Sequence, residues 1–268
     1  MIVLGFDTAT HATAVGLHLA DGTALRASDD PPAEAHPGHA TRLLDLAREL
    51  LDEAGIGWGA LQRIAVGVGP GRFTGLRVGI ATARGLAQSL GVELVGVSSL
   101  HALALGAIEA GDGPDAPTIA VIDARRGEVF AAAYAHGRAT DLPRPLRAAE
   151  LSGVVAEIER EGAPAGERWR AVGDGAVLCA EQLRAGGVEV TEPGSPVHRI
   201  DGAAVCELGA AADGAEAPGP ARPGATPGAS ADAEQTMLAA VLPDYRRSPD
   251  AALARGAAPP PPAGSARA

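Results

Sequence analysis

The sequence contains no lysine, because all 22 of its basic residues are arginine. This absence excludes every mechanism that needs a lysine amine, such as a P-loop lysine, a Schiff base or the strand lysine of protein kinases. Aromatic residues make up only 3% of a chain that is 46% hydrophobic, so its core must be built from Ala, Val, Leu and Ile. Such aliphatic cores are typical of α/β folds with buried parallel strands.

The chain has few cysteines and no long apolar run. Cys179 and Cys206 form no CxxC pair, and the N-terminus lacks the pattern of a signal peptide. No apolar run approaches the roughly 18 residues that a membrane span requires. The net charge of −11, without a basic stripe, opposes binding to a phosphate backbone. We therefore expect a soluble, cytoplasmic protein that meets nucleic acid only through a partner.

Apolar runs and helical periodicity alternate along the chain. Runs bounded by turn residues predict strands at residues 2–6, 12–19, 23–27, 63–68, 93–97, 118–122, 129–133 and 169–172. Apolar residues at helical spacing predict helices at residues 41–54, 76–90, 99–110, 148–160, 176–184 and 203–212.

A unit of strand, acidic turn and strand occurs twice. Placing Asp7 over Asp123 aligns residues 2–6 with 118–122 and residues 13–17 with 129–133. Two such units, each opening one half of the chain, are the pattern of duplicated ribonuclease-H-like lobes. We predict a first lobe at residues 1–112, a smaller second lobe at 118–212, a flexible Ala/Gly/Pro insertion at 213–235, a C-terminal segment packing back on a lobe at 236–255, and a disordered Pro-rich tail at 256–268.

The glycine-rich stretch at residues 67–75 resembles a loop that cradles phosphate at a helix start. No GxxxxGK[ST] motif can be drawn without a lysine, and Arg72 stands where GxGxxG needs its third glycine. A tight strand-to-helix turn with Thr74 near the cap is the favoured alternative.

The turn after the first strand resembles the phosphate turn of actin-like ATPases. Ala9 stands where those proteins usually have glycine, and its Cβ would crowd a close phosphate. The sequence therefore predicts at most a weak nucleotide site, formed by Asp7, Thr8 and Thr10.

No residue pattern indicates a metal or a nucleophile. His36 and His39 are separated by a Pro-Gly pair, whereas helical ligand pairs need an uninterrupted turn. Ser98 and Ser99 do not lie in a GxSxG motif, so a helix N-cap explains them better. We therefore predict no metal site and no catalytic residue.

The helix at residues 76–90 carries unusually little charge. Its only formally charged residues are Arg77 and Arg84, while small residues recur at every fourth position, Gly75, Gly79, Ala83 and Ala87. A helix with so little charge is normally covered on most sides. The stripe of small residues would either admit a partner helix or be buried within the chain itself.

Five blocks of sequence resemble the TsaB family. They are IVLGFDTAT at residues 2–10, HATRLL at 39–44, GVGPGRFTGLRVG at 67–79, GVSSL at 96–100 and IDARRGEV at 122–129. The glycine-rich block is the most specific of them. Pro243, Tyr245 and Arg246 are similar to the family's closing segment.

The resemblance implies an actin-like (ASKHA) α/β fold, with mixed sheets flanked by helices in both lobes. It implies a non-catalytic scaffold subunit in threonylcarbamoylation of the adenosine next to the tRNA anticodon. The partners would be TsaD, as a heterodimer, and the ATPase TsaE, with tRNA met only through the complex. TsaD-like proteins carry two histidines four apart on the first long helix, where this chain has His39 and Leu43. The chain would have no cofactor of its own, leaving ATP or ADP to the complex.

The helices at residues 41–54 and 76–90 are the expected docking face, for TsaD or, in its absence, for a second copy of the chain. The expected interface residues are His39, Leu43, Ala47, Pro70, Phe73, Thr74, Gly75, Arg77, Gly79 and Ala83. Two alternatives remain: an actin-like ATPase or peptidase using Asp7 or Ser98, and a metal-dependent transferase of the TsaD kind.

Overall fold

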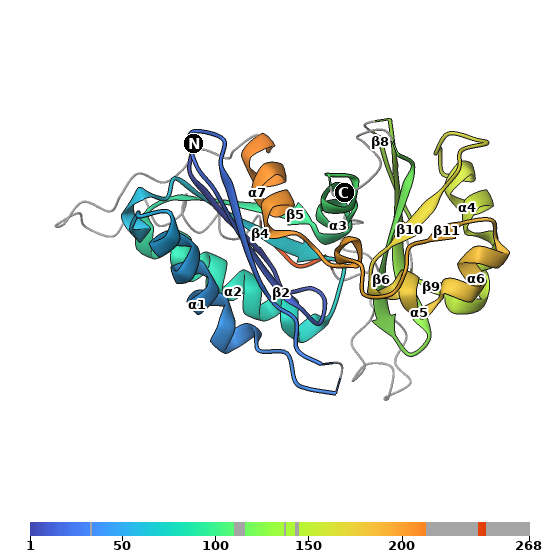
Figure 1. Cartoon of the computed structure of the whole chain (residues 1–268), viewed down its shortest axis with the longest axis horizontal. Helices are drawn as coiled ribbons and strands as arrows, with labels where there is room; N and C mark the ends of the chain where they lie inside the picture. The colour runs from blue at the N-terminus through green and yellow to red at the C-terminus, as the bar shows by residue number, and fades with distance from the viewer. Residues whose placement is uncertain (33, 110–115, 137, 143–144, 213–240, 245–268) are drawn as a thin grey trace, which may run out of the picture.

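The computed structural model describes residues 1–32, 34–109, 116–136, 138–142, 145–212 and 241–244. Within these residues the chain forms two β-sheets, each flanked by helices, with two of the helices lying between the sheets (Figure 1). In the described part of the chain, no helix is long and apolar enough to cross a membrane.

The first sheet has the strand order β3-β2-β1-β4-β5. β1 pairs antiparallel with β2 and parallel with β4, so the sheet is mixed. Every residue of β1 is buried, which explains why it reads as a continuous apolar run. The strands are β1 (Val3–Asp7), β2 (Thr13–His18), β3 (Ala24–Asp29), β4 (Arg63–Gly69) and β5 (Glu93–Ser98).

The second sheet has the order β11-β10-β6-β7-β8, with β9 also pairing with β7. When β6 is placed over β1, the strands follow each other in the same order and direction as in the first sheet. This repetition confirms the predicted actin-like fold of duplicated ribonuclease-H-like lobes. The strands are β6 (Thr118–Arg125), β7 (Glu128–Ala135), β8 (Arg138–Asp141), β9 (Leu146–Arg147), β10 (Arg170–Val172) and β11 (Glu189–Val190).

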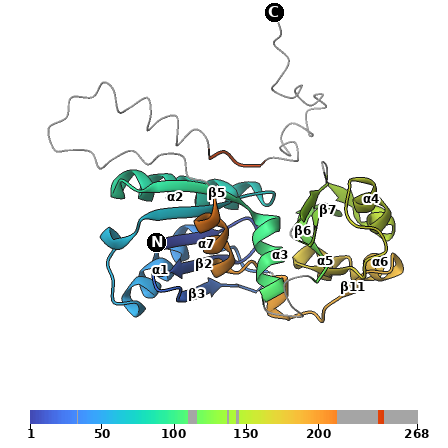
Figure 2. The same cartoon turned by 90° about the horizontal axis from the view of Figure 1, so that it is seen from above.

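Helices cover both faces of each sheet (Figures 1 and 2). α1 (His39–Glu53) and α2 (Phe73–Leu90) pack on the outer face of the first sheet, and their apolar residues share one core with it. α3 (Ser99–Glu109) and α7 (Gly202–Ala211) fill the layer between the sheets, in a core that includes residues of both. The far face of the second sheet is covered by α4 (Val154–Arg160), α5 (Asp174–Leu178) and α6 (Ala180–Ala185).

α7 differs from expectation, because we assigned residues 118–212 to the second lobe whereas this helix packs on β1 and β2 of the first sheet. The close approach needs glycine on both sides. A Cβ on Gly16 would lie 2.2 Å from the carbonyl oxygen of Gly202. Backbone contacts of this kind leave no trace in a hydrophobic pattern, so the sequence could not assign α7 to the first sheet.

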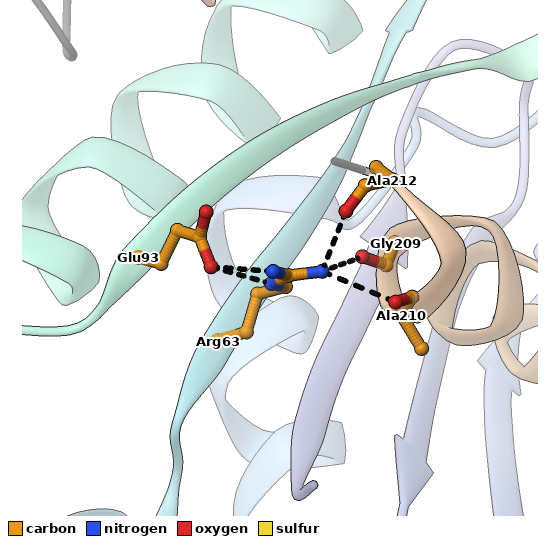
Figure 3. A network of polar contacts seen from close by, with 5 residues as sticks. All are labelled: Arg63, Glu93, Gly209, Ala210 and Ala212. Atoms are coloured by element: carbon orange, nitrogen blue, oxygen red, sulfur yellow. Dashed lines mark hydrogen bonds and ion pairs between the residues drawn. The ribbon is translucent and has the colours of Figure 1, made fainter. Parts of the chain in front are cut away.

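The C-terminal end of α7 is held by a buried arginine (Figure 3). Nη1 of Arg63 donates to the carbonyl oxygens of Gly209 at 2.5 Å and Ala212 at 3.1 Å. Nη2 of Arg63 also lies 2.6 Å from Oε2 of Glu93 on the adjacent strand. Arg63 thus supplies the cation that a helix C-terminus favours and ties α7 to β4 and β5.

Several element boundaries differ from the prediction. α2 starts at Phe73, three residues early, with Arg72 as its N-cap. The helix expected at 148–160 is a 3₁₀ segment (Ala148–Gly153) followed by α4, and the one expected at 176–184 divides into α5 and α6 at Cys179. The strands β8, β9 and β11 were not predicted, since two to four residues carry too little periodicity.

Little of the chain beyond α7 is described. The expected insertion at 213–235 and tail at 256–268 lie outside the described residues, as do Tyr245 and Arg246. Of the expected C-terminal segment, residues 241–244 are described. Val241 is buried in the core shared by α1, α2 and the first sheet.

Candidate functional site

The ten expected docking residues lie on α1, on α2 and in the loop before α2. These two helices lie side by side on the outer face of the first lobe (Figure 1). The structure leaves three of the ten exposed, Phe73, Thr74 and Arg77. The other seven are buried in the chain itself: His39, Leu43, Ala47, Pro70, Gly75, Gly79 and Ala83.

The small-residue stripe of α2 faces the chain's own interior, contrary to its expected place in a docking face. A Cβ on Gly79 would lie 2.3 Å from Oγ1 of Thr8, and one on Gly75 would lie 1.9 Å from the Thr8 carbonyl oxygen. The hydroxyl of Thr8 donates to the carbonyl oxygen of Gly75 at 2.8 Å. The stripe therefore lets α2 approach the turn after β1. This arrangement is the second of the two possibilities given for the stripe, burial within the chain itself.

The outward face of α2 is nearly uncharged. Arg77 is the one charged residue among its exposed positions, and its guanidinium lies 3.7 Å from the ring centroid of Phe73 in a cation–π contact. On neighbouring α1, Leu44 is 45% exposed. The exposed residues of α2 are Phe73, Thr74, Arg77, Ala81, Gly85, Gln88 and Ser89.

We use the name docking face, after the role expected from the sequence, for Leu44 on α1 together with these seven exposed residues of α2. Five of these eight residues were not among the ten expected ones: Leu44, Ala81, Gly85, Gln88 and Ser89. Leu44 is an apolar residue next to the buried Leu43 in α1, and Ala81 and Gly85 lie on the side of α2 opposite the stripe. The low charge of the helix predicts that most of it is covered, but a helix with little charge on any side does not reveal which side is outermost.

The loop before α2 packs tightly on the turn after β1. Gly69 has a φ of +105°, a conformation that favours glycine, and the bond from Gly69 to Pro70 is cis. A Cβ on Gly71 would lie 2.5 Å from the Cβ of Ala9. The amide of Arg72 donates to the Ala9 carbonyl oxygen at 2.7 Å. These contacts fix the point at which α2 begins.

A buried carboxylate anchors the same loop. Oδ1 of Asp7 accepts from the amide of Ala9 at 2.6 Å, and Oδ2 accepts from the hydroxyl of Ser99 at 2.5 Å. The Ser99 oxygen in turn accepts from the amide of Gly69 at 3.2 Å. Burial raises the pKa of Asp7, whereas the hydrogen bonds from the Ser99 hydroxyl and the Ala9 amide lower it. Ser98 accepts from the amide of His101, in agreement with a helix-capping role.

The expected nucleotide residues do not fit a phosphate at this turn. Both carboxylate oxygens of Asp7 and the hydroxyl of Thr8 are bonded within the chain, and both residues are buried. Ala9 is fully buried and packs against Gly71, so the loop before α2 covers this turn. Thr10 is partly exposed, and its hydroxyl donates to the carbonyl oxygen of Ala12 at 3.5 Å.

The histidine on α1 is likewise bound within the chain. Nδ1 of His39 lies 2.8 Å from Oγ1 of Thr13, and burial lowers the pKa of His39. One turn further on, Leu43 lies in the hydrophobic core. Among the residues that the structure describes, no three His, Cys, Asp or Glu side chains gather closely enough to hold a metal ion.

Comparison with known proteins relates the chain to tRNA modification proteins. Residues 31–152 match a family model described as "TsaD: tRNA N6-adenosine threonylcarbamoyltransferase". The chain is similar to the tRNA threonylcarbamoyladenosine biosynthesis protein TsaB of Escherichia coli K12, with 38% identity over 134 residues, which are 50% of this chain and 55% of that protein. The TsaB protein of Haemophilus influenzae is 35% identical over 130 residues, covering 48% of this chain and 52% of that protein.

The chain thus spans about half the length of the curated relatives it matches. Among solved structures, it is similar to "YeaZ from Pseudomonas aeruginosa", with a TM-score of 0.66 and 27% identity. That match covers 91% of this chain and 99% of the other. The similarity in sequence is therefore partial, whereas the similarity in fold extends over nearly the whole of the solved chain.

Proposed function

Because the chain belongs to the TsaB family, we propose that it takes part in the biosynthesis of threonylcarbamoyladenosine in tRNA, as a non-catalytic subunit that docks on a TsaD-like protein. The nearly uncharged outward face of α2 is the observation that carries the docking role. A helix that meets only water normally carries more charge than the single exposed Arg77.

The docking face has the composition of an interface. Its α2 part combines the exposed ring of Phe73 with small and neutral residues and one arginine that stacks on that ring, and Leu44 is the exposed apolar side chain of α1. Interface cores are depleted in charged residues other than arginine and enriched in aromatics. A stable interface removes roughly 1,200–2,000 Å² from water, and two adjacent helices could supply a large part of one partner's share.

The non-catalytic role is supported by the interior of the first lobe. Asp7 uses both of its oxygens to hold the chain together, and Thr8 uses its hydroxyl to hold α2. Leu43 stands one turn from His39, where TsaD-like proteins have a second histidine, and its side chain offers no ligand atom. We propose that a TsaD-like partner supplies the transfer chemistry, with a TsaE-like ATPase joining the complex.

We also propose that the partner supplies the contact with tRNA. The net charge of −11 makes approach to a phosphate backbone unfavourable for the chain alone. In an electrophoretic mobility shift at physiological salt, tRNA should bind when the TsaD-like protein is present and not at micromolar concentrations of this chain alone. Micromolar binding by the isolated chain would contradict this part of the proposal.

Charge introduced on the docking face tests the proposal directly. Gly85→Glu and Leu44→Glu place a carboxylate on α2 and α1, and a Cβ at Gly85 has no atom within 4 Å outside its own helix turn. Leu178→Glu is the matched control, because Leu178 is 63% exposed but lies in the second lobe. All three should fold with circular dichroism spectra like wild type.

The affinity for the TsaD-like protein of the same organism is then measured by calorimetry. Each docking-face variant should bind at least about tenfold more weakly, as expected for an unpaired charge in an interface core, and the control should bind as wild type does. Wild-type affinity in both docking-face variants would refute the assignment. A second copy of the chain could use the same face, so sedimentation without the partner should show the same loss of self-association.

A further inference from the structure

The strand that precedes the docking helix contains a bulge at Val68. β4 and β5 pair regularly up to Gly67, and their register then shifts between Gly67 and Gly69. The bulged residue is thereby removed from the ladder, which frees its carbonyl oxygen for another donor. That donor is the amide of Asp244, at 2.7 Å and 176 positions further along the chain.

Residues 241–244, which we call the C-terminal strap, are attached at both of their ends. The carbonyl oxygen of Asp244 lies 3.3 Å from the place a Cβ of Gly69 would take, against the loop that leads into α2. At the other end, Nη2 of Arg84 on α2 donates to the carbonyl oxygen of Val241 at 2.6 Å. The strap therefore lies beside α2 (Figure 2, red).

The side chains of the strap separate its inner surface from its outer one. Val241 is 7% exposed and belongs to the core that α1 and α2 share with the first sheet, whereas Leu242 is 62% exposed. A Cβ on Gly96 of β5 would lie 3.4 Å from Cγ1 of Val241. The strap thus fills a place between α2 and the edge strand.

We propose that the C-terminal strap is a positioning element of the docking face, and that binding of the TsaD-like partner depends on it. The inference rests on the proposed function for its partner, but the attachment of the strap can be tested without one. The strap holds the loop before α2 from one side, while Ser99 and Ala9 hold it from the other through the amides of Gly69 and Arg72. Releasing the strap should leave the start of α2 free to shift, so that fewer molecules present the binding geometry.

One hydrogen bond can be removed with a matched control at the same position. Asp244→Pro eliminates the amide donor to Val68, whereas Asp244→Ala keeps that amide and removes only the side chain. The first readout is amide hydrogen exchange of residues 69–76 in the full chain without partner. Loss of this hydrogen bond should speed exchange there by about tenfold in Asp244→Pro, and by clearly less in Asp244→Ala, which retains it.

A second pair of variants guards against local misfolding at residue 244. Val241→Asp places a carboxylate in the core and should expel the strap, whereas Leu242→Asp places the same charge at an exposed neighbour. Exchange at residues 69–76 should rise in the first and stay unchanged in the second. Thermal melts must show that each variant retains a folded first lobe.

The second readout is affinity for the TsaD-like protein. Asp244→Pro and Val241→Asp should each bind at least about fivefold more weakly than their controls, if the binding-competent geometry becomes the minor one. Unchanged exchange in both strap variants would overturn the positioning role, whatever the partner does. Faster exchange with unchanged affinity would overturn the dependence of docking on the strap. If wild type fails to bind at all, the proposed function fails while the exchange data still decide the positioning role.

Discussion

The hydroxyl of Ser99 lies 2.5 Å from Oδ2 of Asp7 and joins the first turn of α3 to the end of β1. Both side chains are buried, and the same serine oxygen accepts from the amide of Gly69 in the loop before α2. An aspartate in the turn after the first strand would be a candidate for phosphate chemistry from sequence alone. In this structure its two oxygens instead secure the loop from which α2 starts.

Removal of the Ser99 hydroxyl should therefore destabilise the first lobe. Ser99→Ala leaves Oδ2 of the buried Asp7 and the amide of Gly69 without a partner, which should cost about 2–3 kcal/mol of unfolding free energy. Ser98→Ala is the control, since Ser98 only caps α3 through the amide of His101 and its loss should cost about 1 kcal/mol or less. Urea titration followed by circular dichroism measures both. Equal stability of the two variants would contradict the anchoring role of Ser99.

The buried Asp7 should also give stability a particular pH dependence. Burial raises the pKa of Asp7 above its ordinary value of 3.8, so the folded state holds this proton more tightly than the unfolded state does. The contribution of Asp7 to stability is therefore fully present below 3.8 and is lost as pH rises through the folded-state pKa. In Asp7→Asn the side chain at position 7 cannot ionise, so its contribution to stability does not change with pH.

Urea titrations of wild type and Asp7→Asn between acid and neutral pH provide the measurement. The unfolding free energy of wild type minus that of the variant should become more negative as the pH rises above 3.8. Taking the difference cancels the titration of all the other carboxylates. A difference that stays constant across this range would show that the pKa of Asp7 is not raised in the folded protein.

Two glycines of α2 should respond oppositely to the same substitution. Gly79→Ala puts a methyl group 2.3 Å from Oγ1 of Thr8, so either α2 must shift or the Thr8 hydroxyl must turn and lose its bond to Gly75. Overpacking of this kind should cost about 1–3 kcal/mol. Gly85→Ala meets no atom within 4 Å and should stabilise the protein by about 0.5–1 kcal/mol, because alanine is the better helix former. Thermal melts should move in opposite directions, and a shift in the same direction would mean that the two faces of α2 are assigned incorrectly.

The buried pair Arg63 and Glu93 should show strong energetic coupling. Arg63→Leu leaves Glu93 unpaired and removes the donor that caps α7, at a cost of about 3–5 kcal/mol (Figure 3). Glu93→Leu should cost less when Arg63 is already leucine than in wild type. A double-mutant cycle by urea titration should give a coupling of at least about 1 kcal/mol. Additive effects would show that the two side chains do not act as a pair.

The sequence alone was sufficient for the elements that depend on local periodicity. The strand, acidic turn and strand around Asp7 recur around Asp123, and this repetition predicted two lobes that the strand orders confirm. The lack of charge on α2 indicated that something other than water covers part of it. These signals are readable because strands and amphipathic helices impose their spacing on neighbouring residues.

Only the tertiary structure decided which side of α2 packs on the turn after β1 and which side faces outward. Successive residues of a helix are rotated by about 100° around its axis, so the stripe through Gly79 and the positions around Gly85 lie on different sides of α2. Neither side carries enough charge to be recognised from the sequence as the one that faces outward. The contact of Gly79 with Thr8 settles the orientation. The bonds from Ser99 to Asp7 and from Asp244 to Val68 were equally hidden, since they join residues 92 and 176 positions apart and depend on how the chain closes on itself, not on its local pattern.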